Sequence, residues 1–260
     1  MLSNAVRIDE LNGSWLRRFY AGPRGSLRLV CMPHAAGTAA CYSGWHNHVP
    51  DWVDVMAVQY PGREDRYAEP CVDRISELAA GVTAEIMTGG SEPVALFGHG
   101  MGALVAYEVA ILLQRRGRPA VHLAVSGQAA PSRHQLGGTV HYGGEDELVA
   151  ELLRVGSVEP GMLADPELRA LILPAALADY RAVETYRPSI APVLNLPLTS
   201  YYGLADKGVK EADAGCWYEV TYGRFHLRCW PGDHFYLRPR EQSLVRDLST
   251  RLTEVHQTTK

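Results

Sequence analysis

One short segment of the sequence has the pattern of a catalytic turn but lacks the reactive side chain. Residues 97–102 read FGHGMG, with an apolar run before them and an amphipathic helical pattern after them. They fit the G-x-S-x-G turn, which places a nucleophile for acyl transfer on a sharp bend between a strand and a helix. The central position is Gly100, however, which has no side chain to attack a carbonyl group. Glycine relieves the backbone strain of such a bend, so the fold should survive while covalent catalysis is lost.

An imidazole base and a carboxylate to orient it occur later in the chain. Acyl transfer by an activated nucleophile needs both groups. Asp206 follows an expected strand in the sequence GLAD, and His234 follows another in PGDHF. In α/β-hydrolase sheets the order along the chain is nucleophile, acid and histidine. Positions 100, 206 and 234 have that order, so Asp206 and His234 stand where a catalytic acid and base are expected.

Backbone N–H groups that could stabilise an oxyanion are expected at two places. One is the N–H of Met101, at the start of the helix that follows the bend, where the helix dipole adds positive potential. The second is an N–H from the loop His34–Gly37, and we expect Ala35 or Ala36 to supply it. The sequence therefore contains every part of an acyl-transfer site except the nucleophile.

Other polar residues near these positions have simpler structural interpretations. We expect His99 to pack behind the bend and His34 to fix the shape of the loop that it heads, rather than to transfer protons. Cys41 is the thiol nearest in sequence to the site, but the bend presents position 100 and not position 41. Asp233 adjoins the candidate base, and neighbouring side chains point in different directions. The charged run 63–66 is either a solvated face or a support for the loop at the rim of the site.

The elements that must position these residues alternate between strand and helix patterns. Such alternation indicates βαβ units, and we predict an α/β-hydrolase fold: a mostly parallel sheet with helices on both faces. Residues 1–131 and 188–260 should form the core, and the helical stretch 132–187 should form an inserted lid, because it is too long for one crossover helix. Strands are expected at 27–32, 53–59, 94–97, 121–126, 196–202 and 225–230, and helices at 75–87, 101–114, 146–155, 166–186 and 240–255.

Composition excludes several classes of function. The chain has 260 residues, 47% of them hydrophobic, which suits one domain with a sizeable core. A net charge of −4 gives no basic stripe for nucleic acid. Five cysteines lack metal-ligand spacing and suggest reduced thiols. We see no signal peptide and no apolar stretch near the ~18 residues of a membrane span, so we expect a soluble, cytoplasmic protein without a membrane partner.

Four segments together resemble the type II thioesterases of polyketide and nonribosomal peptide pathways. They are MPHAAGTAACY, QYPGREDR, FGHGMGALVAYEVA and WPGDHFYL, in consistent order from about Leu27 to Leu237, and QYPGREDR is the most diagnostic. The resemblance implies an enzyme that removes acyl groups from the phosphopantetheine arm of an acyl or peptidyl carrier protein. It implies a monomer with no cofactor of its own. It also implies that Asp206 and His234 are the triad acid and base, that Gly100 stands where the family has serine, and that residues 63–66 support the rim of the site.

Three hypotheses account for Gly100. The chain is a thioesterase whose serine was replaced deliberately, to trap a substrate or stop turnover. Alternatively, the glycine is natural and the His234–Asp206 pair is a general base for direct water attack, cyclisation, isomerisation or proton abstraction. In the third hypothesis the protein is a non-catalytic module that binds a carrier protein. The complete base, acid and oxyanion loop argue against the third, and the first two stay open.

Overall fold

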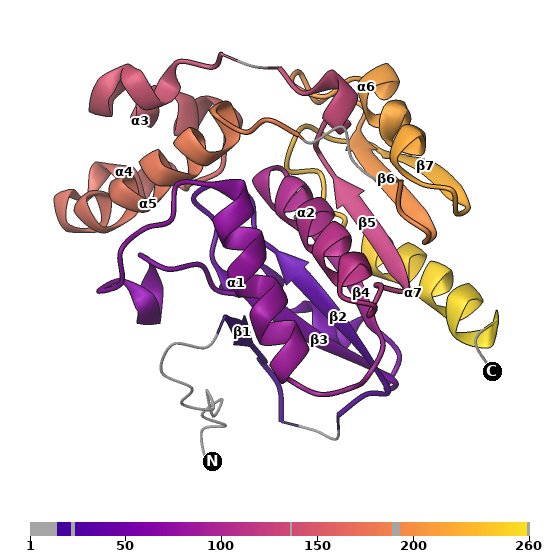
Figure 1. The fold of residues 1–260 in the computed structure, drawn as a ribbon. Helices are drawn as coiled ribbons and strands as arrows, with labels where there is room; N and C mark the ends of the chain where they lie inside the picture. Colours follow the sequence, from indigo (N-terminus) through magenta and orange to yellow (C-terminus); the bar gives the residue numbers. More distant parts are fainter. Residues whose placement is uncertain (1–14, 22–23, 136, 189–192, 259–260) are drawn as a thin grey trace.

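A computed structural model describes residues 15–21, 24–135, 137–188 and 193–258. Its centre is a seven-stranded sheet in the order β1-β3-β2-β4-β5-β6-β7 (Figure 1). All neighbouring strands are parallel except β1 and β3, which are antiparallel. The strands are β1 (Leu16–Arg17), β2 (Leu27–Met32), β3 (Val53–Val58), β4 (Val94–His99), β5 (His122–Ser126), β6 (Leu198–Gly203) and β7 (Phe225–Trp230).

Alternation along β2 shows why both faces of the sheet must be covered. Leu27, Leu29 and Cys31 pack into one apolar cluster, whereas Val30 and Met32 pack into another on the opposite face. Helices α1 (Ile75–Thr88) and α2 (Met101–Arg115) cover the second face, and α7 (Glu241–Thr258) covers the first (Figure 1). A parallel sheet with both faces buried and helices on both sides is the predicted α/β-hydrolase architecture.

The segment between β5 and β6 is helical, as its sequence pattern predicts. It contains α3 (Gly144–Val155), α4 (Pro160–Ala164) and α5 (Pro166–Glu184), which lie together beyond the sheet in Figure 1. Asp165 caps α5 by accepting hydrogen bonds from two N–H groups of its first turn, and Pro166 fits its first position. These helices share a small apolar cluster of their own, formed by Leu148, Leu152, Val158, Leu163, Leu173 and Ala176. Their role as a lid stays a prediction.

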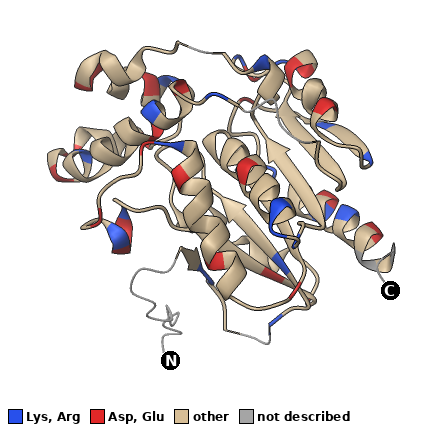
Figure 2. Ribbon diagram, viewed as in Figure 1, with Lys and Arg blue, Asp and Glu red and all other residues tan. Residues whose placement is uncertain are grey.

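The expected strands and helices agree with the structure to within two residues at most of their ends. Three short strands or α-helices were not expected: β1, which pairs with β3, α4 and α6 (Glu211–Gly215). Residues 1–14 of the predicted core lie outside the described residues. No helix in the described part of the chain is long and apolar enough to cross a bilayer. Acidic and basic residues are interspersed along the same helices, as on α7, rather than gathered in one basic stripe (Figure 2).

Candidate active site

The bend between β4 and α2 has the backbone of a nucleophile elbow. Gly100 lies between the two elements with φ 53° and ψ −121°, a conformation that L-residues rarely adopt. The flanking glycines are required for close backbone approach: a Cβ on Gly98 would lie 2.0 Å from the carbonyl oxygen of Gly102, and one on Gly102 would lie 2.1 Å from that of Met32. The elbow is therefore built without the residue that it usually presents.

Asp206 and His234 meet at the ends of adjacent strands. Asp206 follows β6 and His234 follows β7, and His234 Nδ1 donates a hydrogen bond to Asp206 Oδ2 over 2.8 Å. The Asp206 side chain is 2% exposed and that of His234 is 22% exposed. Burial by itself raises the pKa of Asp206, but the hydrogen bond from His234 and those from the N–H groups of Gly208 and Val209 outweigh it and lower the pKa. The carboxylate stays ionised and holds the imidazole.

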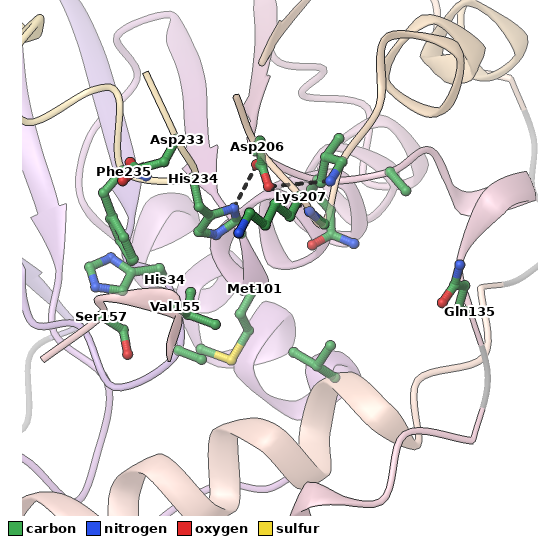
Figure 3. Close-up of a pocket in the computed structure, with 18 of the residues that line it drawn as sticks. His34, Met101, Gln135, Val155, Ser157, Asp206, Lys207, Asp233, His234 and Phe235 are labelled. Carbon is green, nitrogen blue, oxygen red and sulfur yellow. Dashed lines mark hydrogen bonds and ion pairs between the residues drawn. The ribbon is translucent and has the colours of Figure 1, made fainter. Parts of the chain in front are cut away.

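The same imidazole faces the empty position of the elbow. A Cβ on Gly100 would lie 3.5 Å from His234 Nε2 and 3.5 Å from the Cβ of His34, with no closer neighbour. Because the Asp206 carboxylate only accepts hydrogen bonds, a neutral His234 carries its proton on Nδ1 and its lone pair on Nε2. Figure 3 shows the dashed contact between His234 and Asp206 at the cavity wall. The basic nitrogen is thus directed at the place where a nucleophile would be.

Two of the three predicted oxyanion donors are available. Ala35 and Met101 line the cavity, and no acceptor among the described residues takes a hydrogen bond from either N–H. The prediction for Ala36 is wrong. Its N–H donates to Asp179 Oδ2 over 2.7 Å, because Ala36 has φ 62° and its amide is directed toward α5. The candidate oxyanion site therefore consists of the Ala35 and Met101 amides.

The other two histidines near the bend are buried. His99 is 0% exposed, and its Nδ1 contacts Ser126 Oγ at 2.9 Å, which in turn lies 2.5 Å from the hydroxyl of Tyr236. Burial lowers the pKa of His99 well below 6.5, and burial followed by the charge of Arg238 lowers the pKa of His34 to about 3. Both rings are neutral at pH 7. His99 packs behind the bend, as predicted, whereas His34 lies at the cavity wall at the start of its loop.

The charged run 63–66 is only half solvated. Arg63 and Arg66 are buried, whereas the two acidic residues between them are exposed. Arg63 forms a two-point ion pair with Asp179 of α5 and donates to the carbonyl oxygen of Gly37. Arg66 pairs with Glu69. Arg63 therefore supports the loop at the rim of the site, as predicted, whereas the hydrogen bonds of Arg66 go to Glu69 and to the carbonyl oxygen of Gln59 and not to that loop.

A cavity of about 550 Å³ opens beside these groups. Asp233 reaches its wall, but the carboxylate accepts a hydrogen bond from the N–H of Phe235 and so serves its own loop (Figure 3). Cys41 is not among the lining residues. The cavity wall is formed by the loop after β2, the elbow, the helical insertion and the segments that follow β5, β6 and β7. The lining residues are His34, Ala35, Gly100, Met101, Gly127, Gln128, Ala129, Arg133, His134, Gln135, Glu151, Arg154, Val155, Ser157, Tyr180, Val183, Ala205, Asp206, Lys207, Gly208, Val209, Asp213, Asp233, His234 and Phe235.

Sequence reasoning missed Asp179. It lies in α5 with both carboxylate oxygens engaged and a side chain that is 0% exposed. A signal was present, because Asp179 shares helical spacing with Ala175, Ala176 and Ala182, all of which are buried. A carboxylate in the apolar stripe of a helix needs a buried partner. The pattern indicates that a partner exists but does not identify it.

Comparison with known proteins agrees with this geometry. The protein-family model described as the thioesterase domain matches residues 27–252. Thioesterase PikA5 of Streptomyces venezuelae is 38% identical over 254 residues, covering 97% of this chain and 89% of the relative. The structure of the type II thioesterase BorB from the borrelidin biosynthetic cluster is 39% identical with a TM-score of 0.85, covering 92% of this chain and 97% of BorB. The RedJ thioesterase of the prodiginine pathway in Streptomyces coelicolor is 36% identical with a TM-score of 0.80, covering 90% and 91%. The chain therefore belongs to the thioesterase family and has the α/β-hydrolase fold of the type II thioesterases.

Proposed function

We propose that this protein binds an acyl chain held as a thioester on the phosphopantetheine arm of an acyl or peptidyl carrier protein. We further propose that His234 and Asp206 act there as a general-base pair on a nucleophile that is not part of the protein. One observation carries the proposal: His234 Nε2 lies 3.5 Å from the place where the Cβ of residue 100 would be, and that place is empty. The reaction would take place in the cytoplasm on a monomer.

A water molecule above Gly100 is the simplest nucleophile for this arrangement. As its oxygen attacks the thioester carbonyl carbon, one of its protons passes to His234 Nε2. The amides of Ala35 and Met101 would stabilise the negative charge that develops on the carbonyl oxygen. When the carbon–sulfur bond breaks, the imidazolium returns the proton to the leaving thiolate. The products are a carboxylic acid and the free thiol of the arm, with no acyl-enzyme between them.

The relatives support the choice of substrate. BorB and RedJ are thioesterases from the borrelidin and prodiginine biosynthetic pathways. The cavity volume of about 550 Å³ lies within the usual range for sites that hold a small organic ligand. Its wall combines apolar side chains such as Val155 and Val183 with the His234–Asp206 pair. An acyl chain can lie against the insertion while its thioester reaches the base.

Turnover by this route is expected to be slow. Loss of the serine nucleophile in subtilisin costs about a millionfold in kcat, and a residual ~10³–10⁴ over water comes from the oxyanion site and binding. A general base on water recovers part of that loss, since such catalysis contributes about 10²–10⁴. The protein should therefore show measurable but weak thioester hydrolysis.

Acyl-carrier-protein hydrolysis under single-turnover conditions tests the proposal. We expect His234→Ala to lower the rate at least 10-fold and Asp206→Asn to lower it similarly, because each disables the base. Asp233→Asn is the matched control, since this neighbouring carboxylate holds only its own loop and should leave the rate unchanged. A slow hydrolysis that persists in His234→Ala would remove the base from the mechanism. Carrier-protein binding without any turnover would instead indicate a non-catalytic module.

A second candidate uses the same base on the substrate itself. The empty elbow leaves room beside His234 Nε2 for a hydroxyl group or an acidic C–H of the bound acyl chain. Proton removal there would lead to cyclisation or isomerisation instead of hydrolysis. An acyl thioester with a terminal hydroxyl group discriminates the two by mass, because a lactone is one water lighter than the free acid. Free acid as the sole product would exclude cyclisation of that substrate.

A further inference from the structure

A buried carboxylate joins the helical insertion to the candidate oxyanion loop. Asp179 of α5 is 0% exposed, and its Oδ2 accepts hydrogen bonds from the N–H of Ala36 and from Arg63 Nη1, both at 2.7 Å. Its Oδ1 accepts from Arg63 Nη2 at 2.9 Å. All three donors belong to the core, whereas the acceptor belongs to the insertion.

Arg63 completes the connection from the other side of the loop. Its Nη1 also donates to the carbonyl oxygen of Gly37 at 3.1 Å. The Asp179–Arg63 pair therefore engages the N–H of Ala36 and the carbonyl of Gly37, which directly follow Ala35. Ala36 has φ 62°, a left-handed conformation that is unfavourable for a residue with a side chain. Such a conformation persists only where surrounding contacts fix it, and here the contacts are with Asp179 and Arg63.

We propose that Asp179 is a positioning residue: with Arg63, it holds the loop so that the Ala35 amide is directed into the cavity. Because Asp179 belongs to α5, the Ala35 amide is held in this direction only while α5 is packed against the core. Tyr180 and Val183 of the same helix line the cavity, so an acyl chain that contacts them also stabilises α5 in that position. The insertion thereby couples substrate occupancy to oxyanion stabilisation. The catalytic half of this inference rests on the proposed function.

The electrostatics of the pair make the connection difficult to break. Arg63 is 6% exposed, and withdrawal of Asp179 would leave a buried guanidinium without its carboxylate. It would also leave the Ala36 amide without an acceptor. Movement of α5 away from the core therefore costs free energy, because it breaks these contacts. The same movement releases the loop that positions the Ala35 amide.

The first test uses Asp179→Asn in a Gly100→Ser background, where hydrolysis is fast enough to separate kcat from KM. Asparagine keeps the size of the side chain, but it has one acceptor oxygen and one donor group in place of two acceptors. We expect kcat to fall about 10- to 100-fold with KM changed less than about twofold, because an oxyanion donor acts on the transition state. The control is Asp54→Asn, another buried carboxylate paired with an arginine but outside the cavity. An equal fall in kcat in both variants, or no fall in the first, would overturn the proposal.

The second test needs no activity. Hydrogen exchange is followed at residues 34–40 in the protein with Gly100 unchanged, with and without Asp179→Asn. We expect exchange in this loop to speed up at least 10-fold, while the sheet is unaffected. Unchanged protection would overturn the positioning role, whereas faster exchange without activity in the Gly100→Ser background would count against the proposed function alone. If Asp179→Asn does not fold, Arg63→Lys decides, since it keeps the charge but loses the two-point contact, and the same two readouts apply.

Discussion

The elbow at Gly100 and the loops after β6 and β7 differ in whether they carry the side chains that the chemistry needs. The loops carry both of their functional side chains, with His234 and Asp206 joined over 2.8 Å. The elbow has the bend, the close glycine contacts and φ 53°, but no side chain at its centre. The backbone of the site is thus independent of the nucleophile. His234 is hydrogen-bonded to Asp206 but faces no side chain at position 100. It can therefore act as a base only on a water molecule or a substrate group that enters the cavity.

Restoring a hydroxyl group at the elbow is the change with the largest expected effect. Gly100→Ser should raise thioester hydrolysis by about 10⁴- to 10⁶-fold, the reverse of the loss measured when a serine protease loses its nucleophile. A Cβ at this position has ordinary contact distances of 3.5 Å, so the side chain fits. Steady-state release of free thiol measures the gain. Gly100→Ala is the control, and an equal rate in the two variants would show that the elbow does not present residue 100 to the substrate.

Loss of the Asp206 carboxylate is expected to have the second-largest effect on hydrolysis. In the Gly100→Ser background, Asp206→Asn should lower kcat by up to about 10⁴-fold, because an amide fixes the wrong tautomer of His234. The measurement is the same thiol-release assay with the melting temperature as a check on folding. Asp233→Asn in that background should leave kcat within about twofold. A comparable loss from both variants would mean that the loop, and not the Asp206–His234 contact, is what matters.

The buried histidines should make the stability of the protein depend on pH in the acid range. Burial lowers the pKa of His34 and His122 to about 3 and that of His99 well below 6.5. Below pH 6.5 the unfolded chain binds protons at these sites and the folded protein does not, so stability is full above pH 6.5 and is lost as the pH falls toward 3. Each group contributes a slope of about 1.4 kcal/mol per pH unit.

Urea unfolding at several pH values between 7.5 and 5 checks this prediction. His122 lies in β5, where its Nε2 contacts Thr199 Oγ1 at 3.1 Å, and it does not line the cavity. His122→Gln should therefore reduce the slope by about 1.4 kcal/mol per pH unit without affecting activity. An unchanged slope would indicate that His122 is protonated in the folded protein.

The smallest expected effect concerns the strain of the bend. Gly100→Ala should lower the free energy of unfolding by about 1–3 kcal/mol, because alanine is unfavourable at φ 53° even where there is space for its Cβ. Chemical denaturation measures the difference. Gly161→Ala, in the insertion, is a useful comparison because nothing lies within 4 Å of its Cβ and its φ is not positive. Equal stability of Gly100→Ala and the starting protein would mean that residue 100 does not keep its positive φ in the variant.

The parts of the site that the sequence predicted are those formed by local patterns. Strands β2 and β7 have the predicted ends because each strand-forming segment is followed directly by turn residues. Gly100 was found from its own flanking glycines. Asp206 and His234 were found because each follows a strand, and parallel strands end at the same edge of the sheet.

The parts that were missed depend on contacts between distant segments. The oxyanion role of Ala36 was wrongly predicted because its amide is taken by Asp179, 143 positions away along the chain. Strand β1 has only two residues, too few to show an alternation, and forms because β3 offers it an edge. Neither the direction of one amide nor a short edge pairing can be predicted from local sequence, because both are decided by tertiary packing.

The most direct test of the central claim is the rate at which a fluorophosphonate labels the Gly100→Ser protein, with and without His234→Ala, followed by intact mass. If His234 Nε2 serves the space above residue 100, labelling should occur at one site, should be absent from the protein with Gly100, and should slow at least 100-fold when His234→Ala is added. Equal labelling rates with and without the imidazole would contradict the account.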